Sequence, residues 1–404
     1  MLTRNVVERT LVVAFGVGMG PLVQLIATPF LARLFTPAEF GQLALFLSSV
    51  SVLIAISCLR YELAIAVVED ESVNASVWVA LSSALVLFVV MLLLVAAGIP
   101  QALFPAFAAL GPEAWGVPFV GASGGIVLVG SYLTLRQSRY YRNAAMRSAQ
   151  AVLFVAVALG SSNVGLVRAS IISSLVVGAV VMVYLLKVIS PVAKYQIRSL
   201  GIRFRNYPLL LTPTSLLDAV ALAVPVFFIS TAYGLEATGQ YTQIQRLIGA
   251  PLILAGVVVG QLFLKQSAEL FRNGQSSRPL VWKSIGALSV VALIMMAMLF
   301  IAGEPLCKMI LGDAWRVDMK FLIMVATPFL FKSVISPVST VFITHNKVGS
   351  GVKWQVSYFI STISVLYFAS RYVIFDAFLI IYAIHEAFHY SVYLLMANLA
   401  AEKK

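Results

Sequence analysis

The chain has 404 residues, of which 61% are hydrophobic and 11% charged, and its mean hydropathy is +0.97. A soluble globular domain carries about 25% charged residues, so a water-soluble fold could not bury this much apolar surface. The net charge of +12 comes from Lys and Arg in short loops between apolar runs, not from a basic groove or arm, which argues against nucleic acid as a partner.

Apolar runs long enough to cross a bilayer as helices recur along the whole chain, with short polar gaps between them. They predict an all-α integral membrane protein with about twelve transmembrane helices. In the first half the predicted spans are 10–34, 40–63, 74–98, 116–136, 143–160 and 166–187. In the second half they are 208–233, 238–264, 284–303, 319–343, 352–371 and 374–397. We therefore expect two six-helix bundles as domains, 1–200 and 201–404.

The basic residues predict how the chain crosses the membrane. With the N-terminus inside, twenty Lys and Arg lie on the cytoplasmic side and six on the other, which leaves Arg246 and Lys332 within helices. By the positive-inside rule, this excess places both termini in the cytoplasm. All five tryptophans fall near predicted helix ends, where indole rings prefer the membrane interface.

A faint internal repeat relates residues 34–42 (LFTPAEFGQ) to residues 232–240 (AYGLEATGQ), at an offset of 198 residues. Each segment joins the first two predicted helices of its half. With six helices per half the repeat is parallel, as in several transporter families with a midplane site between the halves.

The first two predicted helices carry three polar candidates. Gln24 lies in a proline-interrupted helix, and such helices can bend and expose polar groups to a cavity. Arg60 and Glu62 lie in the sequence LRYELAIAVVEDE, near the cytoplasmic end of the second helix. We expect that helix to run past the edge of the hydrocarbon.

The eighth predicted helix begins GQYTQIQRLIGAP, which places Gln243, Gln245 and Arg246 in an otherwise apolar span. Such a polar cluster needs water or a partner. Asp218 in the seventh helix is the candidate partner for Arg246. A structural ion pair and a substrate site are both consistent with this pattern.

Lys332 lies near the middle of the tenth predicted helix, with Ser336 and Thr340 following at helical spacing on the same face. An ionisable group at this depth is costly and is a functional candidate. We interpret Lys332 as a cationic contact for an anionic substrate group. The alternative is a snorkelling lysine or one neutralised by a neighbouring acid.

The last predicted helix contains HEAFH at 385–389, a formal match to the zinc-protease pattern HExxH. No third ligand in a suitable context accompanies it. His385, Glu386 and His389 instead belong to one polar stripe that also contains tyrosines. Such a stripe suits a proton or cation site, or a hydrogen-bonded helix contact.

No Walker loop or appended nucleotide domain is present, so we expect an ion gradient, the membrane potential or the substrate gradient to supply energy. Cys58 and Cys307 lie in different halves and do not form a thiolate metal pattern. We predict no cofactor, no metal site and no enzymatic activity.

Three segments resemble the Wzx-like polysaccharide and O-antigen flippases, members of the multidrug/oligosaccharidyl-lipid/polysaccharide exporter superfamily. Residues 36–67 are similar to the loop and second helix of that family, 206–270 to its helices seven and eight, and 311–342 to the approach to helix ten. The resemblance runs over almost the whole chain. It consists of extended patterns and contains no catalytic signature.

The resemblance implies a MATE-like arrangement of two six-helix bundles around a central cavity, in a bacterial inner membrane. It implies alternating access that moves an undecaprenyl-pyrophosphate-linked oligosaccharide (an O-antigen, capsule or exopolysaccharide unit) to the outer leaflet. The implied partners are this glycan lipid and membrane lipids, with polysaccharide polymerase machinery as a further possibility. A pyrophosphate needs cationic hosts and sugars need amide donors. The candidate substrate contacts are Arg60, Arg246, Lys332, Gln24, Gln243 and Gln245.

The candidate ion-coupling residues are Glu62, Asp218, His385, Glu386 and His389. Two other functions stay open. One is a multidrug or cation exporter of the same superfamily. The other is an intramembrane enzyme, either a zinc protease using the 385–389 motif or a polysaccharide polymerase or ligase, for which the external gaps 99–115 and 304–318 are short.

Overall fold

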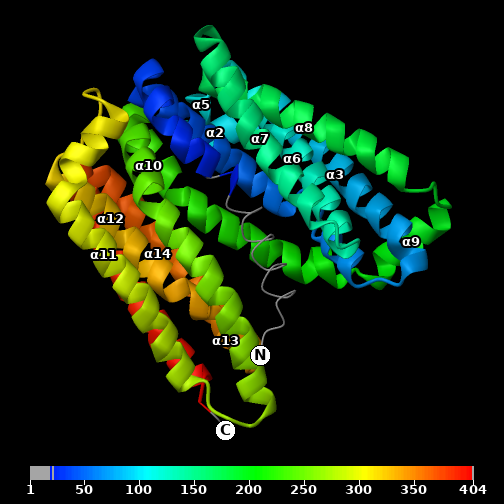
Figure 1. The fold of residues 1–404 in the computed structure, drawn as a ribbon. Helices are drawn as coiled ribbons and strands as arrows, with labels where there is room; N and C mark the ends of the chain where they lie inside the picture. Colours follow the sequence, from blue (N-terminus) through cyan, green and yellow to red (C-terminus); the bar gives the residue numbers. More distant parts are fainter. Residues whose placement is uncertain (1–18, 21, 403–404) are drawn as a thin grey trace. The chain divides into compact units, whose positions relative to one another are not determined.

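The computed structural model describes residues 19, 20 and 22–402, and each predicted span contains a helix within that range (Figure 1). Residues 10–18 of the first predicted span and both ends of the chain lie outside the described residues. A helix satisfies its backbone hydrogen bonds internally, which is what a segment in hydrocarbon requires. The prediction of an all-α membrane fold is confirmed.

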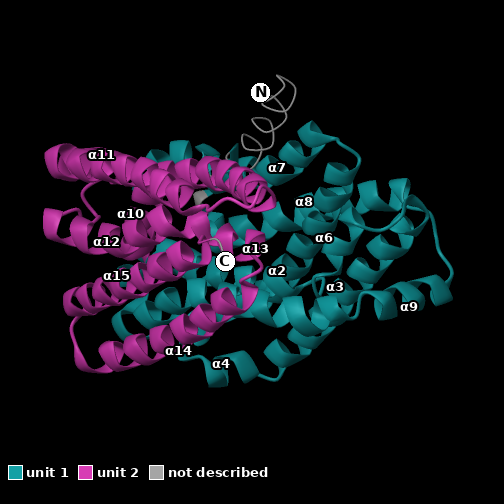
Figure 2. Cartoon of the chain, turned by 90° about the horizontal axis from the view of Figure 1, so that it is seen from below, with its two compact units in different colours: residues 1–238 teal, residues 239–404 magenta. Residues whose placement is uncertain are grey.

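The chain divides into two compact units, residues 1–238 and 239–404 (Figure 2). The predicted division into six-helix bundles, 1–200 and 201–404, stays a prediction.

Unit 1 begins with the helix Leu22–Leu34 and continues through long helices separated by short turns. Its elements are α2 (Pro37–Ile56), η1 (Tyr61–Ala66), η2 (Asp70–Ser72), α3 (Val73–Ala96), α4 (Ile99–Leu103), α5 (Pro105–Ala108), η3 (Gly111–Trp115), α6 (Gly116–Arg136), α7 (Tyr140–Gly160), η4 (Ser162–Val164), α8 (Leu166–Val188), α9 (Lys194–Arg203) and η5 (Tyr207–Leu211).

The long element α10 (Thr212–Arg272) passes from unit 1 into unit 2 and consists of two helices. Gly234 separates them, with φ 85° and ψ 175°. This region of backbone space is essentially restricted to glycine, because it has no Cβ. The two helices correspond to the seventh and eighth predicted spans, 208–233 and 238–264.

Unit 2 contains the second part of α10 and the elements that follow it. These are α11 (Arg278–Leu311), α12 (Met319–Ile335), η6 (Ser336–Thr340), α13 (Val341–Thr344), α14 (Val348–Tyr372) and α15 (Phe375–Ala400).

In the described part of the chain, nine helices are long and apolar enough to cross a membrane. One of them, Tyr207–Arg272, contains two predicted spans. The helix Leu22–Leu34 and α14 correspond to the first and eleventh predicted spans. Together these helices account for each of the twelve predicted spans.

Small residues let the helices of unit 1 pack closely. The central helix α6 packs against α2, α3, α7 and α8. A Cβ at Gly125 would lie 2.7 Å from the Ser57 Oγ, and one at Gly130 would lie 2.6 Å from a Val181 methyl carbon. Without a hydrophobic driving force between helices, close van der Waals packing of this kind holds membrane helices together.

In unit 2 the helix α15 packs against α12 and α14, and α11 packs against α12. Polar side chains of α15, including Glu386 and His385, are buried in this packing. Large apolar side chains such as Leu293 and Ile301 of α11 are exposed, as expected for helix faces that meet lipid.

Candidate functional site

The helix that carries Arg60 is interrupted close to that residue. The α-helix α2 ends at Ile56, so the predicted continuous helix 40–63 is wrong over its last turns. Leu59 and Arg60 have left-handed backbones, with φ 49° and 63°, before the 3-10 turn η1 begins. This conformation costs about 1–2 kcal/mol per non-glycine residue. The surrounding structure must therefore stabilise the break.

Buried apolar contacts fix the segment after the break. Ala64 and Ile65 of η1 have no exposed surface, and they belong to one core cluster with Val77 of α3 and Leu133 of α6. Tertiary packing thus overrides the local helical pattern.

Polar contacts from other helices hold the same segment. Arg136 of α6 donates to the Ile65 carbonyl at 2.7 Å and to Asp70 Oδ1 at 2.6 Å. The Tyr61 hydroxyl donates to the Gly201 carbonyl of α9 at 3.1 Å. These bonds anchor η1 on both sides.

A second contact with α9 lies at the end of this loop. Arg203 forms two hydrogen bonds with the Glu69 carboxylate, at 2.9 and 3.0 Å. These bonds lower the pKa of Glu69 to about 2, so the carboxylate stays charged at neutral pH.

Arg60 and Glu62 face each other at the break. Arg60 Nη1 lies 3.5 Å from Glu62 Oε1, and the side chains are 30% and 3% exposed. Among the described residues, Arg60 Nε and Glu62 Oε2 are buried and find no hydrogen-bond partner. Leaving such atoms unpaired is costly, so this pair retains capacity to bind a ligand or a proton.

A residue that the sequence analysis did not select lies near this pair. The phenol of Tyr132 in α6 interacts electrostatically with Glu62 and Arg60, and also with Arg147 of α7. Arg147 belongs to the fifth predicted helix, where the sequence analysis counted it only for topology. Two cationic side chains therefore act on the Tyr132 hydroxyl.

The remaining candidates of unit 1 lie elsewhere in it. Gln24 is half-buried in the helix Leu22–Leu34, and its backbone carbonyl accepts a hydrogen bond from Thr28 Oγ1 at 2.9 Å. Asp218 is exposed on the first helix of α10. Its predicted partner Arg246 belongs to unit 2, and that pairing stays a prediction.

The polar residues at the start of the second helix in α10 differ in burial and in hydrogen bonding. Gln243 is 2% exposed, and within the described structure its Nε2 has no partner. Arg246, one turn later, and Gln245 are partly exposed. Gln240 instead holds a loop, since its amide oxygen accepts from the Arg316 N–H at 2.8 Å.

Lys332 is partly buried near the end of α12. The α-helix stops at Ile335 and tightens into the 3-10 turn η6, Ser336–Thr340. The N–H of Ser336 still bonds to the Lys332 carbonyl, so the predicted α-turn between these two residues is present. The predicted continuation of that α-helical face to Thr340 is wrong. Pro337 explains the change, because proline lacks the N–H that the α-helix would need there.

The histidine stripe of α15 forms a compact buried cluster with α14. Ser361 Oγ lies 3.0 Å from His385 Nε2 and 2.8 Å from His389 Nε2. The Tyr358 hydroxyl donates to Glu386 Oε1 at 2.7 Å, and His385 Nδ1 lies 3.5 Å from the same oxygen. A serine hydroxyl thus occupies the point at which both Nε2 atoms aim.

This arrangement does not suit the zinc-protease interpretation. In a zinc site of that type, the metal binds both histidine nitrogens and a third protein ligand. Across the described residues, no group of three or more His, Cys, Asp or Glu is arranged to hold a metal ion.

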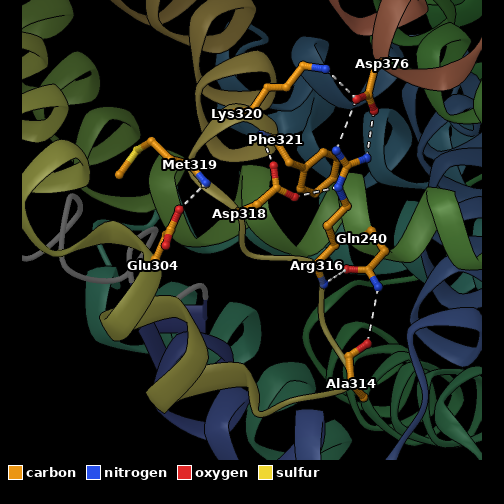
Figure 3. Close-up of polar contacts among 9 residues, drawn as sticks. All are labelled: Gln240, Glu304, Ala314, Arg316, Asp318, Met319, Lys320, Phe321 and Asp376. Carbon is orange, nitrogen blue, oxygen red and sulfur yellow. Dashed lines mark hydrogen bonds and ion pairs between the residues drawn. The ribbon is translucent and has the colours of Figure 1, made fainter.

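Figure 3 shows a charged network in unit 2 that the sequence analysis did not predict. Arg316 donates to Asp376 Oδ1 at 2.7 Å and to Asp318 Oδ2 at 2.6 Å, and Lys320 contacts Asp376 at 3.1 Å. Asp318 also accepts from the Phe321 N–H at 3.0 Å and so caps α12. The network joins the N-terminal ends of α12 and α15.

Burial acts to raise the pKa of Asp318, but the hydrogen bond and charge of Arg316 bring it below its ordinary value. The hydrogen bond to Asp376, and to a smaller extent that to Asp318, raises the pKa of Arg316. Both groups are therefore charged at neutral pH, and the network is a set of ion pairs.

Comparison with known proteins identifies the family of this chain and proteins of similar fold. The sequence profile of a family described as polysaccharide biosynthesis protein matches residues 30–320, more than half of the chain. No curated protein sequence matches the chain.

Three solved structures have a similar fold. An inward-facing multidrug resistance MATE family transporter of the MOP superfamily has a TM-score of 0.65 and 14% identity, covering 96% of this chain and 97% of that one. Lipid II flippase MurJ, inward closed, has a TM-score of 0.74 and 11% identity, covering 97% and 86%. A MOP superfamily transporter from Pyrococcus furiosus has a TM-score of 0.63 and 14% identity, covering 97% and 95%.

At these identities the likeness shows the fold alone, which is that of a multi-pass MATE-like membrane transporter. These three structures are transporters and a flippase and not enzymes, as the sequence analysis expects of this chain.

Proposed function

This chain belongs to the polysaccharide biosynthesis protein family, and from that premise we propose that it moves an undecaprenyl-pyrophosphate-linked oligosaccharide across a bacterial inner membrane. The glycan lipid enters from the cytoplasmic leaflet and leaves in the outer leaflet. Both termini lie in the cytoplasm in this proposal, as the excess of basic residues predicts.

The observation that carries the proposal is the Arg60 site at the break of α2. A guanidinium with an unpaired buried Nε sits beside a carboxylate in a short left-handed segment. Arginine binds phosphate oxygens through parallel hydrogen bonds, and a pyrophosphate offers several such oxygens. Interrupted membrane helices expose polar groups in this way only where they line a cavity or contact protein.

The fold supports transport of a lipid-linked substrate, since the flippase MurJ, a protein that acts on lipid II, shares it. In our proposal the cationic contacts also include Arg246 and Lys332, with Gln24, Gln243 and Gln245 as sugar contacts. Membrane lipids and the polysaccharide polymerase machinery are the further partners that we propose.

A multidrug or cation exporter is the second candidate, because a MATE multidrug transporter has a similar fold. Glu62 Oε2, which lacks a partner among the described residues, would favour a cationic substrate. The guanidinium beside it would oppose such a substrate, so we favour the anionic glycan lipid.

The test uses a bacterial strain that lacks its own flippase and carries this gene. Replacing Arg60 by Ala removes a charge-assisted phosphate contact and is expected to lower surface polysaccharide about tenfold or more. Arg60→Lys keeps the charge without the planar fork, so it should restore part of the activity.

The matched control is Arg198→Ala, which removes an exposed arginine of α9. We expect it to leave surface polysaccharide unchanged at equal protein levels. Equal loss in Arg60→Ala and Arg198→Ala, or full activity in both, would remove the Arg60 site from the proposal. Resistance to cationic dyes without surface polysaccharide would favour the exporter.

A further inference from the structure

The buried cluster between α14 and α15 contains titratable side chains that are not needed to contact a substrate. We propose that Ser361, His385, Glu386 and His389 form a proton-binding relay inside unit 2, separate from the Arg60 site. The relay rests on the proposed function in one respect, since the proton it carries would be exchanged during glycan-lipid transport.

Ser361 fixes the protonation pattern of the two histidines. A serine hydroxyl donates one hydrogen bond and can accept two. The Ser361 hydroxyl can also donate to the Tyr358 carbonyl of its own helix, at 3.0 Å. When the hydroxyl turns from that carbonyl to one of the two Nε2 atoms, at 3.0 and 2.8 Å, it donates to that imidazole while accepting an N–H from the other. The two rings then hold complementary tautomers, and one hydroxyl connects them.

The far end of the relay has room for one more hydrogen. Among the described residues, His385 Nδ1 and Glu386 Oε2 are buried and find no hydrogen-bond partner. The side chain of Glu386 is fully buried, and that of His385 is 6% exposed. A buried carboxylate with an unpaired oxygen is stabilised by a positive charge on the neighbouring imidazole.

Other titratable groups around Glu386 come from each helix that packs against it. They are Tyr358 from α14, Tyr382 and Tyr390 from α15 and Tyr241 from α10, whose hydroxyl bonds to Tyr382. Lys332 is the charged residue in the last turn of α12, which also packs against α15. The histidines are the groups in this set whose ordinary pKa lies near neutrality.

One proton can pass through the relay with every bond accounted for. A proton added at His389 Nδ1 lets the Nε2 proton of that ring move to Ser361 Oγ. The hydroxyl proton of Ser361 moves to His385 Nε2, which makes the His385 ring an imidazolium with a proton on each nitrogen. One proton is bound, the positive charge passes from the His389 ring to the His385 ring, and no electrons are transferred. The His385 Nδ1–H then lies 3.5 Å from Glu386 Oε1, and the carboxylate stabilises the positive charge.

Trp354 provides an internal reporter of this event. Its Nε1 donates to the His389 carbonyl at 3.1 Å, and its ring stacks on Tyr358 at 5.0 Å between centroids. The Tyr358 ring in turn lies 5.8 Å from the His385 ring and 5.7 Å from the His389 ring, between centroids. A positively charged imidazole quenches the fluorescence of a nearby indole, so we use the Trp354 emission to report the charge of these histidines.

The experiment uses the full chain in lipid nanodiscs without substrate, with Trp78, Trp115, Trp282 and Trp315 replaced by Phe. We expect the Trp354 emission to show one titration between about pH 5 and pH 8. The double variant with His385→Gln and His389→Gln should abolish it. Glu386→Gln should shift the midpoint to lower pH, because the carboxylate favours the protonated imidazole.

The matched pair of serine variants separates the relay from a general packing effect. Ser361→Ala removes the bridge and should shift the midpoint by half a pH unit or more. Ser364 lies one turn further along α14, is exposed and bonds to the Ile360 carbonyl of its own helix at 2.9 Å. Ser364→Ala should therefore leave the titration unchanged.

Two results would overturn the proposal: a titration that survives replacement of both histidines, or equal midpoints in Ser361→Ala and Ser364→Ala. Because no substrate is present, failure here is distinct from failure of the flippase proposal. Glycan-lipid transport without this titration removes the relay alone. The titration without transport of any glycan lipid removes the flippase proposal alone.

Discussion

Arg60, Glu62 and His385 each keep a buried polar atom that has no partner in the described part of the chain. Sequence reasoning selected all three, because an ionisable residue in an apolar span is costly to keep. Sequence reasoning could not distinguish these residues from Gln240, which occurs in an equally polar run but accepts a hydrogen bond from the Arg316 N–H and so holds that loop. Residue type and depth follow from the sequence, but partners depend on the tertiary fold.

Close helix packing makes Gly178 of α8 sensitive to the smallest substitution. An added Cβ would overlap the Ser123 hydroxyl and lie 3.2 Å from the Ser123 Cα. That hydroxyl is already committed to the Ser174 carbonyl at 2.5 Å. Overpacking of this kind costs about 1–3 kcal/mol, so we expect Gly178→Ala to lower the apparent melting temperature in nanodiscs.

The control for this substitution is Gly286→Ala in the interior of α11, where an added Cβ meets nothing within 4 Å. Alanine has the higher helix propensity, by about 1 kcal/mol, so this variant should melt at the same or a higher temperature. A Gly178→Ala protein as stable as Gly286→Ala would show that α6 and α8 pack less closely than described.

At the scale of elements, the charged network of Figure 3 fixes the start of α12 against the start of α15. Asp376 accepts from both Arg316 and Lys320, and its side chain is 19% exposed. Hydrogen bonds between charged groups contribute about 1.5–3 kcal/mol, and the exposure of both cations reduces this. We expect Asp376→Asn to lose about 1–2 kcal/mol and to speed hydrogen exchange at residues 312–320.

Asp313→Asn is the matched control, since Asp313 is 86% exposed and pairs with Lys308 in the last turn of α11. It should change neither stability nor exchange by a measurable amount. Equal effects of the two substitutions would mean that the network does not hold α12 and α15 together.

Element positions could be predicted well because each span needs an apolar run of fixed length. The early end of α2 and the 3-10 turn after Ile335 could not. The first depends on contacts with α3, α6 and α9, such as Arg136 with the Ile65 carbonyl. The 3-10 turn depends on how α12 responds to Pro337. A proline in the sequence does not by itself specify whether a helix kinks, ends or tightens.

At the scale of the whole molecule, the faint repeat has a structural counterpart inside each unit. Gln42 donates to the Leu110 carbonyl, and Gln240 donates to the Ala314 carbonyl, both at 3.4 Å. The glutamines are 198 residues apart, and the loops they contact contain EAW at 113–115 and DAW at 313–315. Equivalent contacts in both units support a duplicated architecture of the kind found in transporters.

The sequence alone could predict the class of molecule, and its resemblance to flippases implied the fold. It could not predict the chemistry of the relay, because Ser361 and the histidines lie on different helices. Their meeting depends on the packing of α14 against α15.

The most direct test of the central claim is translocation in proteoliposomes that contain undecaprenyl-pyrophosphate-linked oligosaccharide. We would measure how fast inner-leaflet sugar becomes accessible to an external lectin, with and without a proton gradient. The account predicts movement that requires the protein, falls in Arg60→Ala and responds to the gradient. Sugar that stays inaccessible with folded protein and several glycans would contradict it.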